Sequence, residues 1–260
     1  MAQVRGSVFL LVVPCFNEEG RWDVEYWRRM QAVDGVSWLI IDDGSTDATA
    51  AVAQGAGLSS RWRVSSLPSN VGKGEAIRAG LIDALNTADV EGVGFMDADG
   101  AFESDDVARL CHIAREGFAG EPPWDAVWSS RVMLSGRRIH RSPRRHYVGR
   151  IVATYLSVGS DPLPYDTQSG LKFFAPSETL LRCLERPFTT RWLFELEMLA
   201  RWQAVEGASM RIWEEPLHSW SDVPGSKIRG AEMVRVAREL AIIRGLLARP
   251  PGKSPRGDGE

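Results

Sequence analysis

Asp97 and Asp99 are the residues of this sequence whose types and spacing are best suited to chemistry. They flank Ala98 and directly follow the apolar run 93–96. Two carboxylates this close repel each other unless a positive charge lies between them. A hard cation such as Mg²⁺ binds oxygen ligands and often bridges carboxylates and substrate phosphates. The simpler alternative is structural, with Asp99 and Gly100 in a turn and Asp97 as a helix-side cap.

A second pair of acids, Asp42 and Asp43, follows the apolar run 38–41. This segment also fits a strand-to-helix turn in which Ser45 or Thr46 caps the next helix. Such a turn needs only one acid, and two stand at the end of the run. The additional carboxylate is therefore available for another role.

Lys73 lies between two glycines, just before a helical pattern at 76–85. A Gly-Lys pair is part of the phosphate-binding P-loop, but Leu67 and Gly74 stand where that motif needs glycine and Ser or Thr. No Gly-x-Gly-x-x-Gly follows the first apolar run, so the dinucleotide fingerprint is absent too. Lys73 can still meet an anion at a helix start, and the alternative is a solvated surface lysine.

The stretch 131–150 carries a concentrated positive charge. It contains seven arginines, two histidines and no acidic residue, in a chain whose formal net charge is -3. Each arginine alone fits a solvated loop, but a guanidinium can bond two phosphate oxygens at once. Together the arginines indicate an anionic ligand. We expect no nucleic acid, because no recognisable nucleic-acid module accompanies the stretch.

Apolar runs alternate with helical patterns along the chain, which predicts an α/β fold with a largely parallel sheet. Such a sheet binds ligands at the carboxyl ends of its strands, where Asp97 and Asp99 would lie. Strands are predicted at 7–13, where Pro14 is expected to end the first one, and at 38–41, 62–66, 93–96, 125–130, 171–175 and 210–215. Helices are predicted at 47–54, 76–85, 103–116, 177–185, 192–200 and 230–247.

Composition places the chain among soluble globular proteins, with 44% hydrophobic and 25% charged residues in 260. Its three cysteines are far apart and lack metal-ligand spacing, which indicates reduced thiols and a cytoplasmic location. The apolar run 8–13 is too short for a signal peptide, and no run reaches the ~20 residues that span a bilayer. The basic amphipathic helix 230–247 fits either an anionic membrane surface or packing on the rest of the chain.

Eight motifs stand in one order and carry a family resemblance. They are Val-Val-Pro-Cys-Phe-Asn-Glu-Glu (12–19), Ile-Asp-Asp-Gly-Ser-Thr-Asp (41–47), Asn-Val-Gly-Lys-Gly (70–74), Asp-Ala-Asp-Gly-Ala (97–101), Ser-Ser-Arg (129–131), Tyr-Asp-Thr-Gln-Ser-Gly-Leu-Lys (165–172), Trp-Leu-Phe-Glu-Leu-Glu (192–197) and Gly-Ser-Lys (225–227). The set resembles the family 2 glycosyltransferases of the GT-A fold. Within that family it is most similar to the branch of dolichyl-phosphate glucosyltransferases and polyprenyl-phosphate glycosyltransferases.

The resemblance implies a fold and an activity. We expect a single GT-A domain over 1–228, with a Rossmann-like, mostly parallel sheet flanked by helices. An amphipathic helix over 229–248 and a disordered tail over 249–260 would follow. The implied reaction is an inverting, metal-dependent transfer of glucose from a UDP-linked donor to a polyprenyl phosphate. Mg²⁺ or Mn²⁺ would be the cofactor, and the protein would act in the cytoplasm, peripherally at the inner face of the membrane.

The resemblance also implies roles for individual positions. Asp97 and Asp99 would hold the metal, with Asp99 as the main ligand, and Arg131 and Lys227 would contact the donor phosphates. The positions implied to bind the nucleotide sugar are Pro14, Phe16, Glu18, Asp43, Lys73, Asp97, Ala98, Asp99, Arg131 and Lys227. The positions implied to act in transfer are Asp166, Gln168 and Glu195.

Three positions depart from the family pattern. Ala101 stands where the mannosyl-phosphate branch has a metal-binding glutamine, Glu195 replaces an aspartate, and Ser169 replaces a cysteine. Many relatives also carry a membrane helix that this sequence lacks. We therefore keep three alternatives: the same chemistry on a soluble hydroxyl acceptor, a nucleotidyltransferase, and a non-catalytic nucleotide-sugar-binding protein. A hydroxyl acceptor would need a general base, for which Glu195 or Asp166 is the candidate.

Overall fold

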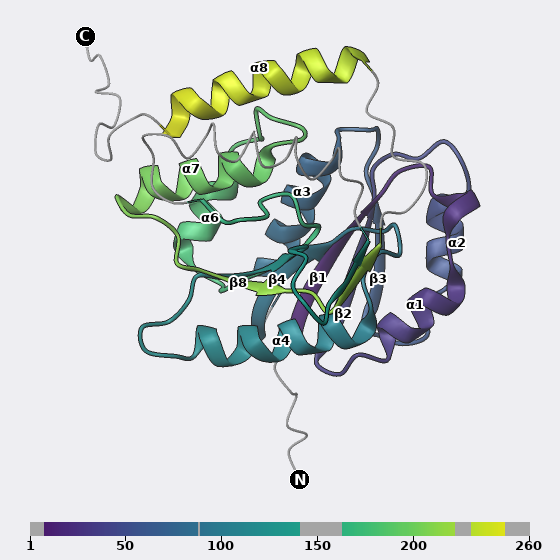
Figure 1. Cartoon of the computed structure of the whole chain (residues 1–260). Helices are drawn as coiled ribbons and strands as arrows, with labels where there is room; N and C mark the ends of the chain where they lie inside the picture. The colour runs from purple at the N-terminus through teal and green to yellow at the C-terminus, as the bar shows by residue number, and fades with distance from the viewer. Residues whose placement is uncertain (1–7, 88, 141–162, 222–229, 248–260) are drawn as a thin grey trace.

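The computed structural model describes residues 8–87, 89–140, 163–221 and 230–247. A seven-stranded sheet with the order β3-β2-β1-β4-β7-β5-β8 occupies the centre of the molecule (Figure 1). Its strands are β1 (Val8–Cys15), β2 (Val36–Asp42), β3 (Trp62–Ser66), β4 (Val90–Met96), β5 (Ala126–Ser130), β7 (Leu171–Phe174) and β8 (Ile212–Pro216). A small second sheet pairs β6 (Arg138–His140) with β9 (Ser219–Ser221).

Most neighbouring strands of the large sheet run parallel, which confirms the predicted α/β class. The exception is β7, which pairs antiparallel with both β4 and β5. Strand order reverses beside β1, because β2 and β3 lie on one side of it and β4 on the other. In open α/β sheets this reversal creates the crevice in which ligands bind.

Helices cover both faces of the sheet (Figure 1). One face carries α1 (Val24–Gln31), α2 (Thr49–Gly55) and α4 (Ser104–Phe118). The other carries α3 (Lys73–Leu85), α6 (Glu178–Leu184) and α7 (Phe194–Glu206), with α8 (Gly230–Leu247) beside α7. A short 3-10 helix, η1 (Glu19–Arg21), follows β1.

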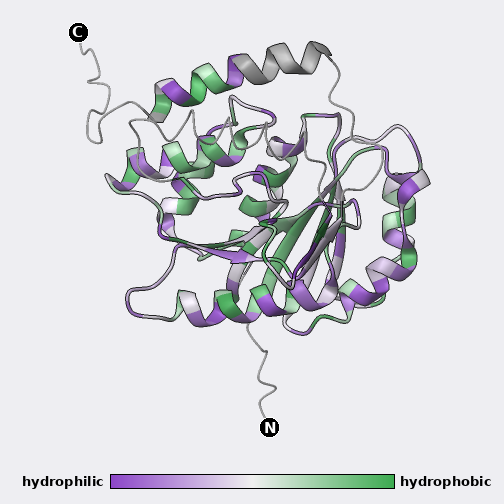
Figure 2. Ribbon diagram, in the orientation of Figure 1, coloured by the Kyte–Doolittle hydropathy of each residue, from purple (hydrophilic) through white to green (hydrophobic). Residues whose placement is uncertain are grey.

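The alternation of side chains along β1 divides the core in two. Phe9, Leu11 and Val13 belong to the core under α1, α2 and α4, whereas Leu10 and Val12 belong to the core under α3, α6 and α7. Successive side chains of a strand point to opposite faces, so a run that is apolar throughout becomes buried on both sides. The apolar colouring of the central strands in Figure 2 reflects this.

Two local predictions about the first β-α units were wrong. Pro14 does not end β1, since the strand continues to Cys15 with Pro14 opposite Ile41. The pairing of β1 with β4 ends at Val12. Pro14 has no N–H, but it therefore costs the β1–β4 ladder no hydrogen bond. Ser45 does not cap α2 either, because its hydroxyl accepts a bond from the Asn17 N–H at 3.0 Å.

Thr46 is not the cap of α2 either. Its N–H donates to Asn17 Oδ1 at 2.9 Å, and the N-cap position is Ala48. The 45–46 segment therefore holds the turn after β1 instead of starting the helix. This turn needs that support because Asn17 has a positive φ of 53°, in the left-handed region that non-glycine residues rarely adopt.

The helix α8 packs on the rest of the chain through its second half. Ile243 is fully buried in the core beside α7, and Glu239 is buried as well. The Glu239 carboxylate accepts the backbone N–H groups of Arg191 at 3.1 Å and Trp192 at 3.0 Å. Among the described residues, none of the helices combines the length and apolarity needed to cross a bilayer. The predicted tail 249–260 lies outside the described residues.

Candidate active site

A cleft of ≈ 350 Å³ lies beyond the carboxyl ends of β1 and β2 and the start of α3. This is the region where strand order reverses. The residues lining it are Pro14, Cys15, Phe16, Glu18, Asp43, Asn70, Gly72, Lys73, Arg191 and Trp192. Five of them, Pro14, Phe16, Glu18, Asp43 and Lys73, were predicted from sequence to bind a nucleotide sugar. Segments distant in the sequence thus converge on one site.

Two exposed aromatic rings belong to the cleft. Phe16 and Trp192 are each 41% exposed, although both are large apolar residues. Aromatic rings at a cleft can stack on a flat heterocycle such as a nucleotide base. Glu18 lies in the same cleft and forms an ion pair with Arg21 at 2.6 Å. Burial raises the pKa of Glu18, and the Arg21 charge only partly opposes this rise.

Asp43 organises the segment that precedes α3. Its carboxylate accepts hydrogen bonds from the Asn70 side chain at 3.0 Å, the Val71 N–H at 2.7 Å and the Gly72 N–H at 2.8 Å. Gly72 has a φ of 97°, and a Cβ there would lie 2.6 Å from the Arg191 guanidinium. Only glycine fits this conformation and this close approach. Asp43 therefore fixes the turn that presents Lys73 to the cleft.

Lys73 connects the cleft to the acidic pair. Its Nζ lies 2.6 Å from Asp97 Oδ1, and both side chains are partly buried. Burial lowers the pKa of Lys73, but the charges of Asp97 and Glu195 outweigh this effect and raise the pKa overall. The Lys73 ammonium is thus a firmly charged group between the lining of the cleft and the carboxyl end of β4.

Asp99 lies at the exposed side of the same strand end. Its Oδ1 accepts the Ala101 N–H at 3.1 Å. Partial loss of hydration and the neighbouring Asp97 charge raise the pKa of Asp99. Such a carboxylate gains from a nearby cation. The side chain of Ala98, between the two acids, packs against the core instead of pointing at a ligand.

The acidic pair fits a divalent metal that is completed by a substrate. Asp97 Oδ1 is buried and, beyond its ion pair with Lys73, has no hydrogen-bond partner among the described residues. In the described part of the chain, no cluster of three or more His, Cys, Asp and Glu side chains could hold a metal alone. Mg²⁺ typically binds through one or two carboxylates together with substrate phosphates and water. Ala101 is buried and offers no further ligand.

Arg131 and Asp166 form a bidentate ion pair that is largely buried. Arg131 follows β5, and its Nε and Nη2 each lie 2.7 Å from an Asp166 oxygen. The guanidinium also lies over the Trp220 ring, with its Cζ 5.0 Å from the ring centroid. Glu214 accepts the Asp166 N–H at 2.6 Å. Two residues that were assigned to phosphate contact and transfer are therefore bonded to each other.

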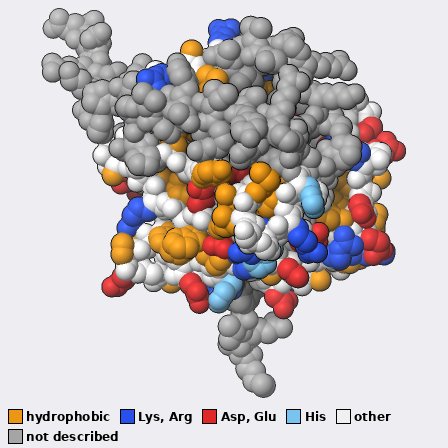
Figure 3. All heavy atoms as spheres, viewed as in Figure 1, with side chains coloured by type: hydrophobic (Ala, Val, Ile, Leu, Met, Phe, Trp, Pro, Cys, Tyr) orange, Lys and Arg blue, Asp and Glu red, His pale blue; other side chains and the backbone are white. Residues whose placement is uncertain are grey.

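The remaining predicted residues lie apart from the cleft lining. Gln168 is exposed in the segment 165–170, whereas Glu195 is buried in α7. Burial raises the pKa of Glu195, and the charges of Lys172 and Lys73 oppose the rise. Lys227 and the second half of the arginine-rich stretch, from 141 onward, lie outside the described residues. In Figure 3, acidic and basic side chains are interspersed along the lower part of the visible face.

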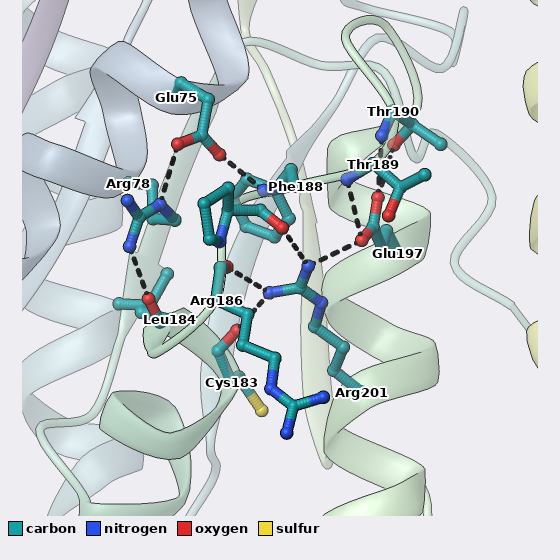
Figure 4. A network of polar contacts seen from close by, with 11 residues as sticks. Glu75, Arg78, Cys183, Leu184, Arg186, Phe188, Thr189, Thr190, Glu197 and Arg201 are labelled. Carbon is teal, nitrogen blue, oxygen red and sulfur yellow. Dashed lines mark hydrogen bonds and ion pairs between the residues drawn. The ribbon is translucent and has the colours of Figure 1, made fainter.

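Glu197, two residues beyond Glu195, has a structural role. Its carboxylate accepts the N–H groups of Thr189 at 3.0 Å and Thr190 at 2.8 Å, and pairs with Arg201 at 2.6 Å. Arg201 also donates to the Cys183 carbonyl at 2.9 Å (Figure 4). This network fixes the segment that leads to Arg191 and Trp192 in the cleft. Glu195 and Glu197 are two positions apart, so they do not share a face of α7, and they serve different surroundings.

The site predictions did not include Lys172 or five residues of the cleft lining, which are Cys15, Asn70, Gly72, Arg191 and Trp192. Arg191 and Trp192 line the cleft because α7 begins beside it, and the quoted motif 192–197 did not by itself assign Trp192 to the cleft. Lys172 ends the quoted motif 165–172, but neither its complete burial nor its partners can be read from that motif. Its sequence signal was a charged residue at the start of an apolar run.

Comparisons with known proteins extend these observations. The family model described as glycosyl transferase family 2 matches residues 11–120. Human dolichyl-phosphate beta-glucosyltransferase is 30% identical over 258 residues, covering 90% of this chain and 74% of that protein. A dolichyl-phosphate beta-glucosyltransferase of Trichomonas vaginalis is 27% identical over 250 residues, covering 89% of this chain and 69% of that protein.

A solved structure of similar fold is glucosyl-3-phosphoglycerate synthase from Mycobacterium tuberculosis, in complex with Mn²⁺, UDP-glucose and phosphoglyceric acid. It matches with a TM-score of 0.63 at 20% identity, covering 95% of this chain and 82% of that chain. At this identity the match establishes a shared fold. That fold includes the sheet edge at which the cleft and the acidic pair lie.

Proposed function

This chain belongs to glycosyl transferase family 2, and we propose that it transfers glucose, with inversion, from UDP-glucose to a polyprenyl phosphate. The family and the GT-A fold agree with the resemblance drawn from the ordered motifs. Glycosyl transfer is the activity of the family. Donor, acceptor and metal are the proposed parts.

One observation carries the donor proposal: the cleft with its exposed rings is lined by Lys73, whose Nζ lies 2.6 Å from Asp97 of the acidic pair. A nucleoside diphosphate has the matching shape, with a flat base at one end and two phosphates at the other. We assign Phe16 to the base, together with Pro14, Glu18 and Asp43, and Lys73 to the diphosphate. The helix start behind Lys73 adds unpaired backbone N–H groups, which favour an anion.

Asp97 and Asp99 would hold Mg²⁺ or Mn²⁺ between β4 and the donor diphosphate. When bound, the metal would supply positive charge to the oxygens of the leaving nucleotide. The mycobacterial structure of the same fold contains Mn²⁺ with UDP-glucose, which supports a divalent metal for the fold without identifying it here. The proposal rests on the two carboxylates of this chain and on the buried Asp97 Oδ1, which has no hydrogen-bond partner among the described residues beyond its ion pair with Lys73.

The protein groups would act by charge and orientation. Lys73, Arg131 and Lys227 are assigned to stabilise negative charge that develops on the departing diphosphate. Asp166 and Gln168 are assigned to the sugar and acceptor side, where a carboxylate favours an oxocarbenium-like state. A phosphate monoester acceptor is already a nucleophile and needs no general base. With a hydroxyl acceptor, Glu195 or Asp166 would have to remove a proton.

The polyprenyl phosphate acceptor is supported by the relatives, which are named dolichyl-phosphate beta-glucosyltransferases. Their similarity extends over most of the length of this chain. The arginine-rich stretch 131–150 offers charge for an acceptor phosphate. The expected site of action is the cytoplasmic face of a membrane, with the protein bound peripherally. The second candidate acceptor is a soluble hydroxyl compound.

The test is release of nucleoside diphosphate from a panel of sugar nucleotides with Mg²⁺ or Mn²⁺, in the presence and absence of a short polyprenyl phosphate. We expect UDP release from UDP-glucose that depends on both the metal and the lipid phosphate. Release that needs only a soluble extract would replace the acceptor. Pyrophosphate release would favour a nucleotidyltransferase, and no release under any condition would favour a binding protein.

A further inference from the structure

Lys172, in β7, is a buried cation directly beneath the candidate site. It has no exposed surface, and a lysine is almost never fully buried unless its charge is paired. Its Nζ donates to the carbonyl oxygens of Thr167 at 3.1 Å and Ser169 at 2.5 Å. The Nζ also lies 3.5 Å from Glu195 Oε1. The ammonium is therefore solvated entirely by protein groups.

Two aromatic rings complete this enclosure. The Nζ lies 4.6 Å from the ring centroid of Trp128 and 5.2 Å from that of Phe95. Ring faces attract cations, and more strongly where water is excluded. Burial lowers the pKa of Lys172, and the Glu195 charge opposes that change. An apolar residue would fill this core position with less desolvation, so the retained charge needs a reason beyond packing.

The carbonyls that Lys172 holds belong to a functionally placed segment. The segment 165–170 carries Asp166, the partner of Arg131. At its end, the Gly170 carbonyl accepts the Asp97 N–H at 2.9 Å. A Cβ on Gly170 would lie 2.3 Å from the Asp97 carboxylate. Any shift of this segment would therefore move Asp166 and press on Asp97 together.

Glu195 links the same cation to a third element. One of its oxygens faces Lys172, and the other, Oε2, is buried without a hydrogen-bond partner among the described residues. Glu195 also raises the pKa of Lys73 through its charge. Charges thus alternate from Lys172 to Glu195, then to Lys73 and finally to Asp97.

We propose that Lys172 is a positioning residue for sugar transfer, which fixes the segment 165–170 against the end of β4 and keeps Asp166 and Asp97 in register. The inference rests on the proposed function for its kinetic consequence, but its structural consequence does not. Among the described residues, no hydrogen bond or ion pair joins Lys172 to the cleft lining or to the acidic pair. Its effect should therefore fall on kcat and leave UDP affinity nearly unchanged.

The test compares Lys172→Met with Arg115→Met. Methionine keeps the length of the side chain and suits the aromatic neighbours, but it removes the charge and the donors. Arg115 is the control, because it also pairs with a glutamate, Glu91 at 2.6 Å, and lies over an aromatic ring, that of Phe9. Glu91 lies near the amino end of β4, and Asp97 follows the carboxyl end of that strand. Both variants should lose thermal stability. Only Lys172→Met should lower kcat, by about tenfold or more, with UDP affinity within about threefold.

Amide hydrogen exchange without substrate provides the second readout. Lys172→Met should speed exchange in 165–170 by about tenfold or more, and Arg115→Met should leave that segment unchanged. A kcat of Lys172→Met within twofold of the wild-type value would overturn the positioning role. Unchanged amide exchange in 165–170 would also overturn it. If the methionine variant does not fold, Lys172→Gln carries the same two criteria. If wild-type protein transfers no sugar, the proposed function fails, and the exchange result still decides the role of Lys172.

Discussion

The Arg131 guanidinium donates two hydrogen bonds to the Asp166 carboxylate, and the Arg131 backbone N–H donates a third to the same carboxylate at 2.9 Å. The two residues are 35 positions apart and come from the end of β5 and from the segment before β7. Neither side chain is thus poised by itself. The ion pair holds Arg131 at the sheet edge. The Asp166 carboxylate is buried, and the Arg131 guanidinium neutralises its charge.

Asp166→Asn should therefore damage both stability and transfer. It leaves the Arg131 guanidinium without its buried counter-charge, and breaking such a pair costs about 3–5 kcal/mol of unfolding free energy. Chemical denaturation and kcat for UDP-glucose measure the two effects. Arg131→Lys is the companion variant: it keeps the charge but cannot form the two-pronged contact, so it should show a smaller stability loss. An Asp166→Asn protein with wild-type stability would contradict the role of this pair.

Asp99→Asn should abolish metal-supported transfer, reducing kcat by about 10³ or more, because it removes the assigned main metal ligand. The fold should survive, since the Asp99 side chain is exposed. Asp105→Asn serves as the control, as it changes another exposed aspartate, in the first turn of α4. Mn²⁺ binding in the presence of UDP, followed by electron paramagnetic resonance, should be lost in Asp99→Asn only. Near-normal turnover in that variant would reject the metal assignment.

Lys73→Met should strengthen binding of Mn²⁺ in the absence of nucleotide. The Lys73 Nζ pairs with Asp97 Oδ1 at 2.6 Å, so a metal cation would compete with the lysine for this carboxylate. Removing an ion pair of this kind should improve affinity for free Mn²⁺ by about fivefold. Affinity for UDP without metal should fall in the same variant. In an Asp97→Asn background the gain in Mn²⁺ affinity should disappear, and a gain that persists there would place the competition elsewhere.

The buried Glu195 should make stability decline as the pH rises. Burial raises its pKa from the ordinary value of 4.5, so the folded state retains the proton more tightly than the unfolded chain does. The associated stability is present below about pH 4.5 and is lost as the pH rises through the elevated folded pKa. The slope is at most ~1.4 kcal/mol per pH unit for one group. Glu195→Gln should remove this contribution from the pH profile of unfolding, and an identical profile in both proteins would refute it.

Glu239 should couple α8 to the cleft. Its carboxylate accepts the N–H groups of Arg191, Trp192 and Leu193, and these residues open α7 beside the donor site. Glu239→Ala leaves the groups without their charged acceptor, at a cost of about 1–3 kcal/mol. UDP affinity should weaken and Trp192 fluorescence should change. Glu25→Ala, at a 67% exposed side chain, should change neither, and equal behaviour of the two variants would dismiss the coupling.

Local signals in the sequence mark the strand ends that carry chemistry. An apolar run that stops at two acids identifies the end of β4, and the glycines around Lys73 identify the start of α3. These signals depend on neighbours within a few residues. They predicted the parallel α/β architecture, whereas the family resemblance implied the five residues that line the cleft.

The missing parts depend on which strands become neighbours. An apolar run does not show whether its strand pairs parallel or antiparallel with its neighbours, so the antiparallel pairing of β7 was not predicted. The pairing of Arg131 with Asp166, and the approach of Arg191 to Asn70 at 3.0 Å, follow from sheet order and helix packing. The burial of Lys172 has the same origin, since β7 lies between β4 and β5. Long-range topology created these contacts, and no local pattern encodes them.

The most direct test of the central claim follows labelled glucose from UDP-glucose into product, with a short polyprenyl phosphate as acceptor and Mg²⁺ or Mn²⁺ present. We predict that the label enters the organic phase as a glucosyl phosphate lipid with the β anomeric configuration, in step with UDP release. Label that stays with a water-soluble product, or an α-linked lipid, would contradict it.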